Sequence, residues 1–155
     1  MAPVAAVAAA TALALVAGAA AIDCIRREIP DAISIAVVVA AVVFGVATPA
    51  FSWWSHAAAP PVIFGFGLLA FSRGWLGGGD VKLLTAIAAW TGLGGLALMF
   101  VATSVAGGGL TAIMLAARRL GGGSATATMR VPYAVAIAVG TAWWLWATGG
   151  GPAAH

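Results

Sequence analysis

Charge is scarce in this sequence. Lysine, arginine, aspartate and glutamate make up 7% of the 155 residues, 63% are hydrophobic, and the mean hydropathy is +1.09. No soluble domain of this size covers so apolar a surface with so few polar groups. Because a bilayer leaves no backbone group unpaired, the alternatives are membrane helices or a closed barrel. The apolar runs lack the alternation that a barrel needs, so the composition predicts an all-α membrane protein.

Cysteine and clustered basic residues are also nearly absent. A single cysteine, Cys24, excludes a disulfide within the chain and a cysteine-based zinc site. The net charge of +3 comes from basic residues scattered between apolar runs, which does not indicate a nucleic-acid-binding face. The two histidines have no partner at ligand spacing, and His56 is expected in an outer loop. No metal or other cofactor is therefore expected.

Six apolar segments follow one another in a single predicted domain over residues 1–155. They are residues 3–22, 32–52, 60–73, 81–92, 95–117 and 131–148. Such runs are typical of membrane-spanning helices. The first resembles a signal peptide, but no lysine or arginine precedes Arg26, so it is predicted to be the first membrane helix.

Segment 81–92 is short for a membrane helix. At 1.5 Å per residue it covers about 18 Å, against a hydrocarbon core of about 30 Å. Three alternatives stay open: the segment reaches only partway, the bilayer thins there, or the helix continues through residues 91–95. A re-entrant segment leaves five membrane helices instead of six.

Basic residues alternate between the polar connections. Every lysine and arginine lies in, or within two residues of, connections 23–31, 72–80 and 118–130, and none lies in 52–61 or 91–95. By the positive-inside rule the first three connections are cytoplasmic, which places both termini outside. Six of the seven tryptophans then fall at outer helix ends, as an aromatic belt predicts. The expected fold is a bundle of about six transmembrane helices.

Two aspartates, Asp23 and Asp80, stand at the edges of apolar runs. The predicted topology places them on one side of the membrane at similar depth, and carboxylates within membrane helices are functional candidates because their insertion is costly. Two adjacent carboxylates that share a proton can activate a water and protonate a tetrahedral intermediate, as in aspartic proteases. The glycines at 77–79 permit close approach of a substrate strand or a helix. The alternative is that Asp80 simply caps the helix it opens.

Neighbouring charged residues have simpler interpretations. Lys82 lies two positions after Asp80, which on a helix turns it away from that carboxylate. It is predicted to extend to the membrane surface instead. Asp31 follows Pro30 and precedes an apolar segment, so it is predicted to be a helix N-cap.

Three stretches resemble one protein family. Residues 77–82, GGGDVK, resemble the GxGD motif of the intramembrane aspartyl proteases, in the extended form typical of type IV prepilin peptidases. Residues 23–30, DCIRREIP, are similar to the first motif of that family, an aspartate followed by basic residues and Ile-Pro. Pro132 and Tyr133 resemble a third feature, a proline and an aromatic residue before the last helix. The matches come in family order and cover nearly the whole chain.

The resemblance is to the short members that serve Flp/Tad-type pilus systems. It implies an aspartic endopeptidase of the bacterial inner membrane that removes the leader of a type IV or Flp-type pilin precursor at the cytoplasmic face, with Asp23 and Asp80 as catalytic residues. The substrate-binding or supporting residues are Gly77, Gly79, Lys82, Arg27, Pro30, Pro132 and Tyr133, with Gly77 and Gly79 admitting an extended substrate.

The same resemblance implies the partners and limits the activity. The partners are the pilin or pseudopilin precursor, the lipid bilayer and other pilus-assembly proteins. Larger relatives carry a cytoplasmic domain with paired cysteines that is associated with N-methylation. This sequence has neither feature, so methyltransferase activity is not implied.

Two other function classes were weighed against the protease. A small transporter or channel subunit would use the acids as a proton or cation relay, but it predicts acids near the bilayer midplane, where the sequence has none. A structural membrane subunit would use the acids as caps and the glycines for helix packing. That alternative leaves the match at residues 23–30 unexplained.

Overall fold

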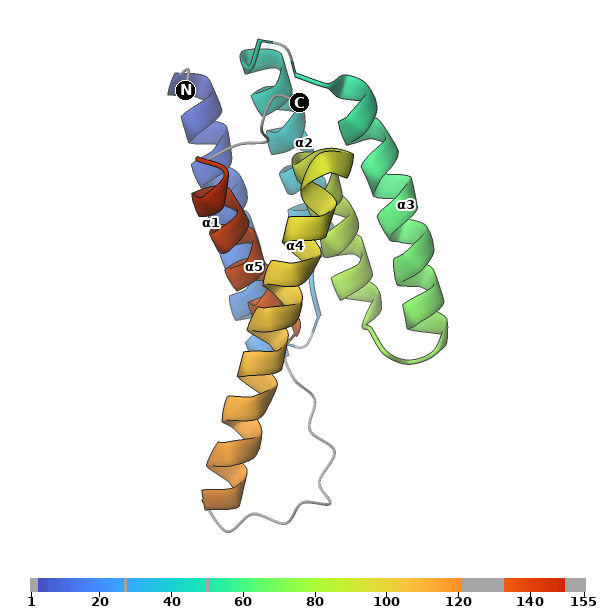
Figure 1. The fold of residues 1–155 in the computed structure, drawn as a ribbon, viewed down its shortest axis with the longest axis vertical. Helices are drawn as coiled ribbons and strands as arrows, with labels where there is room; N and C mark the ends of the chain where they lie inside the picture. Colours follow the sequence, from blue (N-terminus) through green and yellow to red (C-terminus); the bar gives the residue numbers. More distant parts are fainter. Residues whose placement is uncertain (1–2, 27, 50, 121–132, 150–155) are drawn as a thin grey trace.

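The computed structural model describes residues 3–26, 28–49, 51–120 and 133–149 (Figure 1). Over these residues the chain forms five α-helices and no strand: α1 Pro3–Arg26, α2 Asp31–Ala47, α3 Trp53–Ser72, α4 Gly78–Leu120 and α5 Tyr133–Ala147. The all-α prediction is confirmed. By length and composition, α1, α3 and α4 are able to cross a membrane, and α2 and α5 are shorter apolar helices.

Helix α4 consists of two arms joined at Gly92. Gly92 has φ 62° and ψ 175°, outside the helical region, and Figure 1 shows the helix reversing its direction there. We call residues 78–91 the first arm and residues 93–120 the second arm. At 1.5 Å per residue the first arm is about 21 Å long and the second about 42 Å. Segment 81–92 therefore ends where the chain turns back, and the helix does not continue straight through residues 91–95.

The break in α4 is held by two side chains of the first turn of α3. The Nδ1 atom of His56 lies 2.9 Å from the carbonyl oxygen of Ala89, and the Leu93 N–H donates to Ser55 Oγ at 2.9 Å. These are backbone groups that a helix end leaves without a partner inside the helix. His56 is buried in α3, so the expectation of a loop position was wrong. The two side chains fix the direction in which each arm leaves the turn.

Small residues form the buried face of α1 and the closest contact between α5 and the second arm of α4. The buried side of α1 consists of alanines and one valine at helical spacing: Ala5, Ala8, Ala9, Ala12, Val16, Ala19 and Ala20. Gly140 of α5 lies so close to the second arm that a Cβ there would be 2.8 Å from the backbone nitrogen of Thr103. Small residues let helix backbones approach closely, which is how helices associate in lipid. Large apolar side chains are meanwhile exposed on every helix.

The two ends of the bundle differ in what they contain. Figure 1 shows α1 starting, and α5 ending, at the end where α4 turns at Gly92. At the opposite end α1 finishes, α2 begins and the first arm of α4 begins. We call this second end the Asp80 end. It brings the stretches 23–31 and 77–82 together, because α1 contacts α2 and α2 contacts α4.

Candidate active site

The first arm of α4 begins with a cap that uses half of the Asp80 carboxylate. The Val81 N–H donates to the Gly77 carbonyl at 3.1 Å, so Gly77 is the N-cap and Asp80 the third helical residue. The Gly77 N–H in turn donates to Asp80 Oδ2 at 3.3 Å, as in one half of a capping box. Asp80 Oδ1 is buried and has no hydrogen-bond partner among the described residues. Asp80 can therefore cap the helix with Oδ2, and its Oδ1 atom stays available for acid–base chemistry.

Asp23 lies in the last turn of α1 and faces the bundle. It follows Ala19 by four residues and Ala20 by three, and therefore continues the buried face of that helix. Its side chain is partly buried. Asp23 is near enough to Asp80 for its charge to contribute to the environment of that carboxyl. The two aspartates therefore lie at the same end of the bundle.

Gly79 lets the two predicted motifs pack directly against each other. A Cβ at this position would lie 3.1 Å from the Cβ atom of Ile29 and 3.3 Å from its Cγ1 atom. Pro30 follows with φ −61° and ψ 133°, extends the chain and serves as the N-cap position of α2. The side of Gly79 on which a Cβ would stand is therefore occupied by Ile29, a close approach of the kind that glycine permits. The role of Gly77 and Gly79 in admitting an extended substrate stays a prediction.

Lys82 and Asp31 form an ion pair that adds a second link between the two motifs. Lys82 Nζ donates to Asp31 Oδ1 at 2.7 Å, and the two side chains are 53% and 66% exposed. Asp31 is the first residue of α2, after the N-cap Pro30, and no side-chain cap is present. The prediction of Asp31 as an N-cap was therefore wrong. Lys82 does turn away from Asp80, but it pairs with Asp31.

We expect the Lys82–Asp31 pair to contribute little to stability. Because both side chains are more than half exposed, water screens the attraction, and exposed pairs contribute about 0.2–1 kcal/mol. A double-mutant cycle with Lys82→Gln and Asp31→Asn should give a coupling free energy below about 1 kcal/mol. A coupling above about 2 kcal/mol would show that the pair is desolvated and more important than its exposure indicates.

Tyr133 reaches the same region from the start of α5. Tyr133 is partly buried and lies within range of the Asp80 charge. Its ring packs near Gly107, where a Cβ would be 3.5 Å from the nearest ring atom. Gly107 is buried in the second arm of α4. Two other predicted residues, Arg27 and Pro132, lie outside the described residues.

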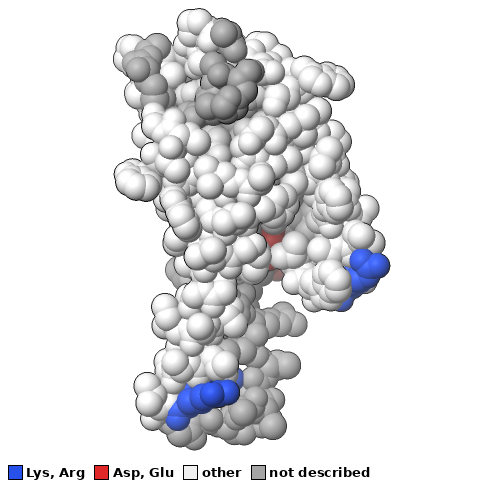
Figure 2. Space-filling view, in the orientation of Figure 1, with Lys and Arg blue, Asp and Glu red and all other residues white. Residues whose placement is uncertain are grey.

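Exposed basic side chains lie on the same half of the molecule as this acidic site. Figure 2 shows acidic atoms recessed among uncharged ones, one basic group to their right and another at the lower end of the molecule. One of the exposed bases, Arg73, lies over the ring of Trp75 at 5.4 Å. Among the described residues no three histidine, cysteine, aspartate or glutamate side chains gather as metal ligands. The chemistry available here is that of two carboxylates with a tyrosine nearby.

Two residues of the site were not predicted from the sequence. Ile29 is the residue that fills the space beside Gly79, and Gly107 is the position that receives Tyr133. Ile29 belongs to the motif at residues 23–30, so its position next to Pro30 could have indicated a role in the site. Gly107 lies in a run of three glycines at 107–109, and nothing in that run distinguishes it from its neighbours.

Two carboxylates at one end of a bundle of apolar helices are the arrangement that an aspartic peptidase in a membrane requires. Comparison with known families agrees with this class. Residues 9–113 match the model of the type IV leader peptidase family, a stretch that contains both aspartates. The chain belongs to this family, whose members are aspartic peptidases. No curated protein and no solved structure gives a significant match.

Proposed function

We propose that this chain is a prepilin peptidase, an aspartic endopeptidase that hydrolyses the leader of a type IV or Flp-type pilin precursor. The observation that supports the proposal is the position of Asp23, in the last turn of α1, and of Asp80, in the first turn of α4, at the same end of the bundle. Membership of the leader peptidase family supports the same reaction. The free Asp80 Oδ1 atom supplies an oxygen that the helix cap does not use.

The proposed mechanism uses the two aspartates as one unit with a single shared proton. The ionised carboxylate takes a proton from a water whose oxygen attacks the scissile carbonyl carbon, while the protonated carboxyl gives its proton to the carbonyl oxygen. The tetrahedral intermediate then collapses, the C–N bond breaks, and a proton passes to the leaving amine. Because a close pair titrates together, the roles of acid and base belong to the pair. Tyr133, which starts α5 and is partly buried, would donate a hydrogen bond to the substrate backbone.

The proposed membrane arrangement has six crossings with both termini outside. The two arms of α4 count as separate crossings, because the chain reverses at Gly92 (Figure 1). Arg26 and Arg73 lie at the Asp80 end, and Arg118 and Arg119 lie at the end of the second arm, which extends beyond it in the same direction (Figure 1). By the positive-inside rule that end faces the cytoplasm. The dyad then acts at the cytoplasmic face, in a bacterial inner membrane.

The proposal includes the short Flp/Tad subtype and cleavage without N-methylation. The sequence lacks the paired cysteines of the methylating relatives. The proposed partners are the precursor, the bilayer and other pilus-assembly proteins. A transporter relay is less well supported, because Asp23 lies in the last turn of α1 and Asp80 in the first turn of α4, away from the middle of either helix.

Cleavage by the purified protein tests this function. The full chain is reconstituted in liposomes with a Flp-type precursor, and the products are identified by mass spectrometry. We expect two products, a short leader and a mature chain that begins at or next to its apolar helix. Precursors that all stay intact, with a chain shown to be folded by circular dichroism, would contradict the proposal.

A further inference from the structure

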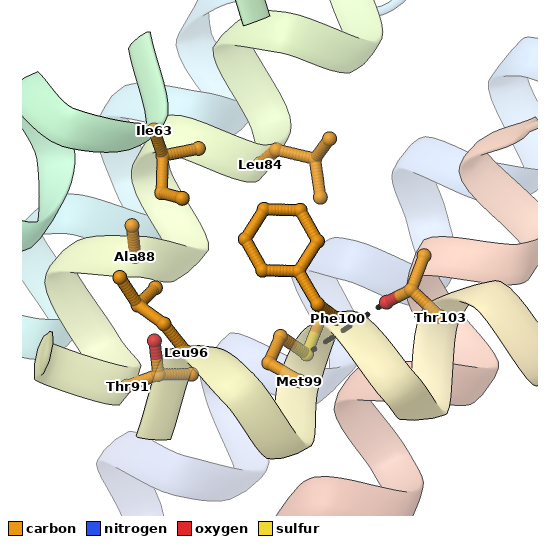
Figure 3. A pocket seen from close by; sticks show the side chains of 8 residues that line it. All are labelled: Ile63, Leu84, Ala88, Thr91, Leu96, Met99, Phe100 and Thr103. Carbon is orange, nitrogen blue, oxygen red and sulfur yellow. Dashed lines mark hydrogen bonds between the residues drawn. The ribbon is translucent and has the colours of Figure 1, made fainter. Parts of the chain in front are cut away.

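An apolar groove separates the two arms of α4 on the side that faces α3. We call it the inter-arm groove (Figure 3). The first arm contributes Leu84, Ala88 and Thr91, and the second arm contributes Leu96, Phe100 and Thr103. Phe100 is 45% exposed, and Figure 3 shows its ring lying across the groove toward Leu84. Ala88, Thr91 and Thr103 are buried and form the floor of the groove, and the partly exposed Leu84, Leu96 and Phe100 form its rim.

The groove runs from the break in α4 toward the candidate active site. Leu84, Ala88 and Thr91 follow Asp80 by four, eight and eleven residues, so they lie on the same stripe of the first arm as that carboxylate. On the second arm, Thr103 is followed four residues later by Gly107. Gly107 contacts Tyr133, which lies within range of the Asp80 charge. Both walls of the groove thus lead to the two aspartates.

The hydroxyl of Thr91 is a second observation at this groove. Thr91 is 2% exposed, and its Oγ1 atom has no hydrogen-bond partner among the described residues. Other helical threonines donate to the carbonyl four residues earlier, as Thr85 and Thr141 do at 2.8 and 2.7 Å. Figure 3 shows the Thr91 oxygen pointing toward the other groove residues. Buried polar groups in native proteins are rarely left unpaired, so this hydroxyl points to a ligand in the groove.

Two other sides of the first arm are covered, and the side with Lys82 is exposed but carries the charged pair with Asp31. Val81 packs against Gly67 of α3, where a Cβ would lie 2.7 Å from Val81 Cγ1. Leu83 and Ile87 are buried in the core cluster that includes α1 and α2. A further apolar helix could therefore run alongside the first arm and reach Asp80 only on the side that faces the second arm.

We propose that the inter-arm groove receives the apolar membrane helix of the substrate. This inference rests on the proposed function. A precursor that is cut just before its apolar helix has that helix within a few residues of the dyad, and the helix must then run through the bilayer beside the first arm. Phe100 swings out of the groove, and an apolar side chain of the substrate takes its place between Leu84 and Leu96, as a knob enters a hole. Thr91 offers its hydroxyl to a polar atom of the same helix.

Photocrosslinking tests the occupant directly. A benzoylphenylalanine replaces Phe100 in the full-length chain in liposomes, in an Asp80→Asn background that keeps the precursor uncut. Ultraviolet light should join this residue to the apolar helix of the precursor, as located by mass spectrometry. The matched control carries the same probe at Val101, which is 56% exposed on another side of the same arm. Equal crosslinking from both positions, or adducts with lipid alone from position 100, would overturn the proposal.

Kinetics give a second, independent measurement. Leu84→Trp fills the groove and should raise KM for the full precursor at least about tenfold, a loss of about 1.4 kcal/mol in binding. Cleavage of a leader peptide that lacks the apolar helix should stay unchanged, as should cleavage of the full precursor by Val101→Trp. An unchanged KM for Leu84→Trp would contradict the groove assignment. Failure of the unsubstituted chain to cut either substrate would instead contradict the proposed function.

Discussion

Replacing Asp80 with asparagine is expected to lower the rate of leader cleavage by about 10²–10⁴-fold, the range for removal of a general acid or base. The substitution keeps the size of the side chain and an oxygen that accepts from the Gly77 N–H, so the cap of the first arm should persist. What is lost is the exchange of a proton with water and substrate. The measurement is the initial rate of precursor cleavage in liposomes at equal amounts of folded protein.

The matched control for Asp80→Asn is Glu28→Gln. Glu28 is an exposed acid in the connection between α1 and α2 and takes no part in the dyad. Its neutralisation removes the same charge from the same end of the bundle. We expect the rate of Glu28→Gln to stay within about twofold of the unsubstituted chain, since exposed charges act weakly through water. Equal losses in both variants would mean that overall charge, and not the dyad, governs cleavage.

Substituting Gly140 with leucine is expected to produce the largest loss of stability. A Cβ on Gly140 would lie 2.8 Å from the Thr103 nitrogen and 2.9 Å from its Cα atom, and backbone atoms cannot move aside as a flexible side chain does. The α5 helix and the second arm must separate, at a cost of about 3 kcal/mol. Unfolding of the purified protein in detergent with increasing SDS measures this loss.

Gly65 provides the control for Gly140→Leu. It lies in α3, and no atom is within 4 Å of a Cβ built there. Gly65→Leu adds the same side chain to a position where it faces open space, and we expect a change below about 1 kcal/mol. A similar loss in both variants would show that the close approach of α5 to the second arm does not govern stability.

Much of the fold could be predicted from apolar segments alone. The six predicted segments correspond to α1, α2, α3, the two arms of α4 and α5, because each needs only a continuous apolar run. A connection at residues 91–95 was predicted, but the sequence left open whether the helix continues through it. The turn at Gly92 uses a positive φ, and contacts with Ser55 and His56, which are distant in sequence, hold it. Glycines elsewhere in the same helix, such as Gly107, remain helical.

The site was predictable where its residues follow motifs and not where they depend on packing. The positions of Asp23 and Asp80 at one end of the bundle follow from helix direction. The contact of Ile29 with Gly79 and the pairing of Lys82 with Asp31 depend on how α2 lies against α4, and the sequence contains no local signal for that packing. Asp31 was predicted as a cap because it follows Pro30 and precedes an apolar segment, and its observed partner, Lys82, is 51 residues away in the sequence.

The central claim is that Asp23 and Asp80 work as one unit, and a comparison of four cleavage rates tests it most directly. The initial rate is measured in liposomes for the unsubstituted chain, Asp23→Asn, Asp80→Asn and the double variant. Residues that act as a unit show non-additive effects. We predict that each single variant falls to the rate of the double variant. A single variant that keeps most of its activity, or a double variant whose loss is the product of the two single losses, would contradict the shared role.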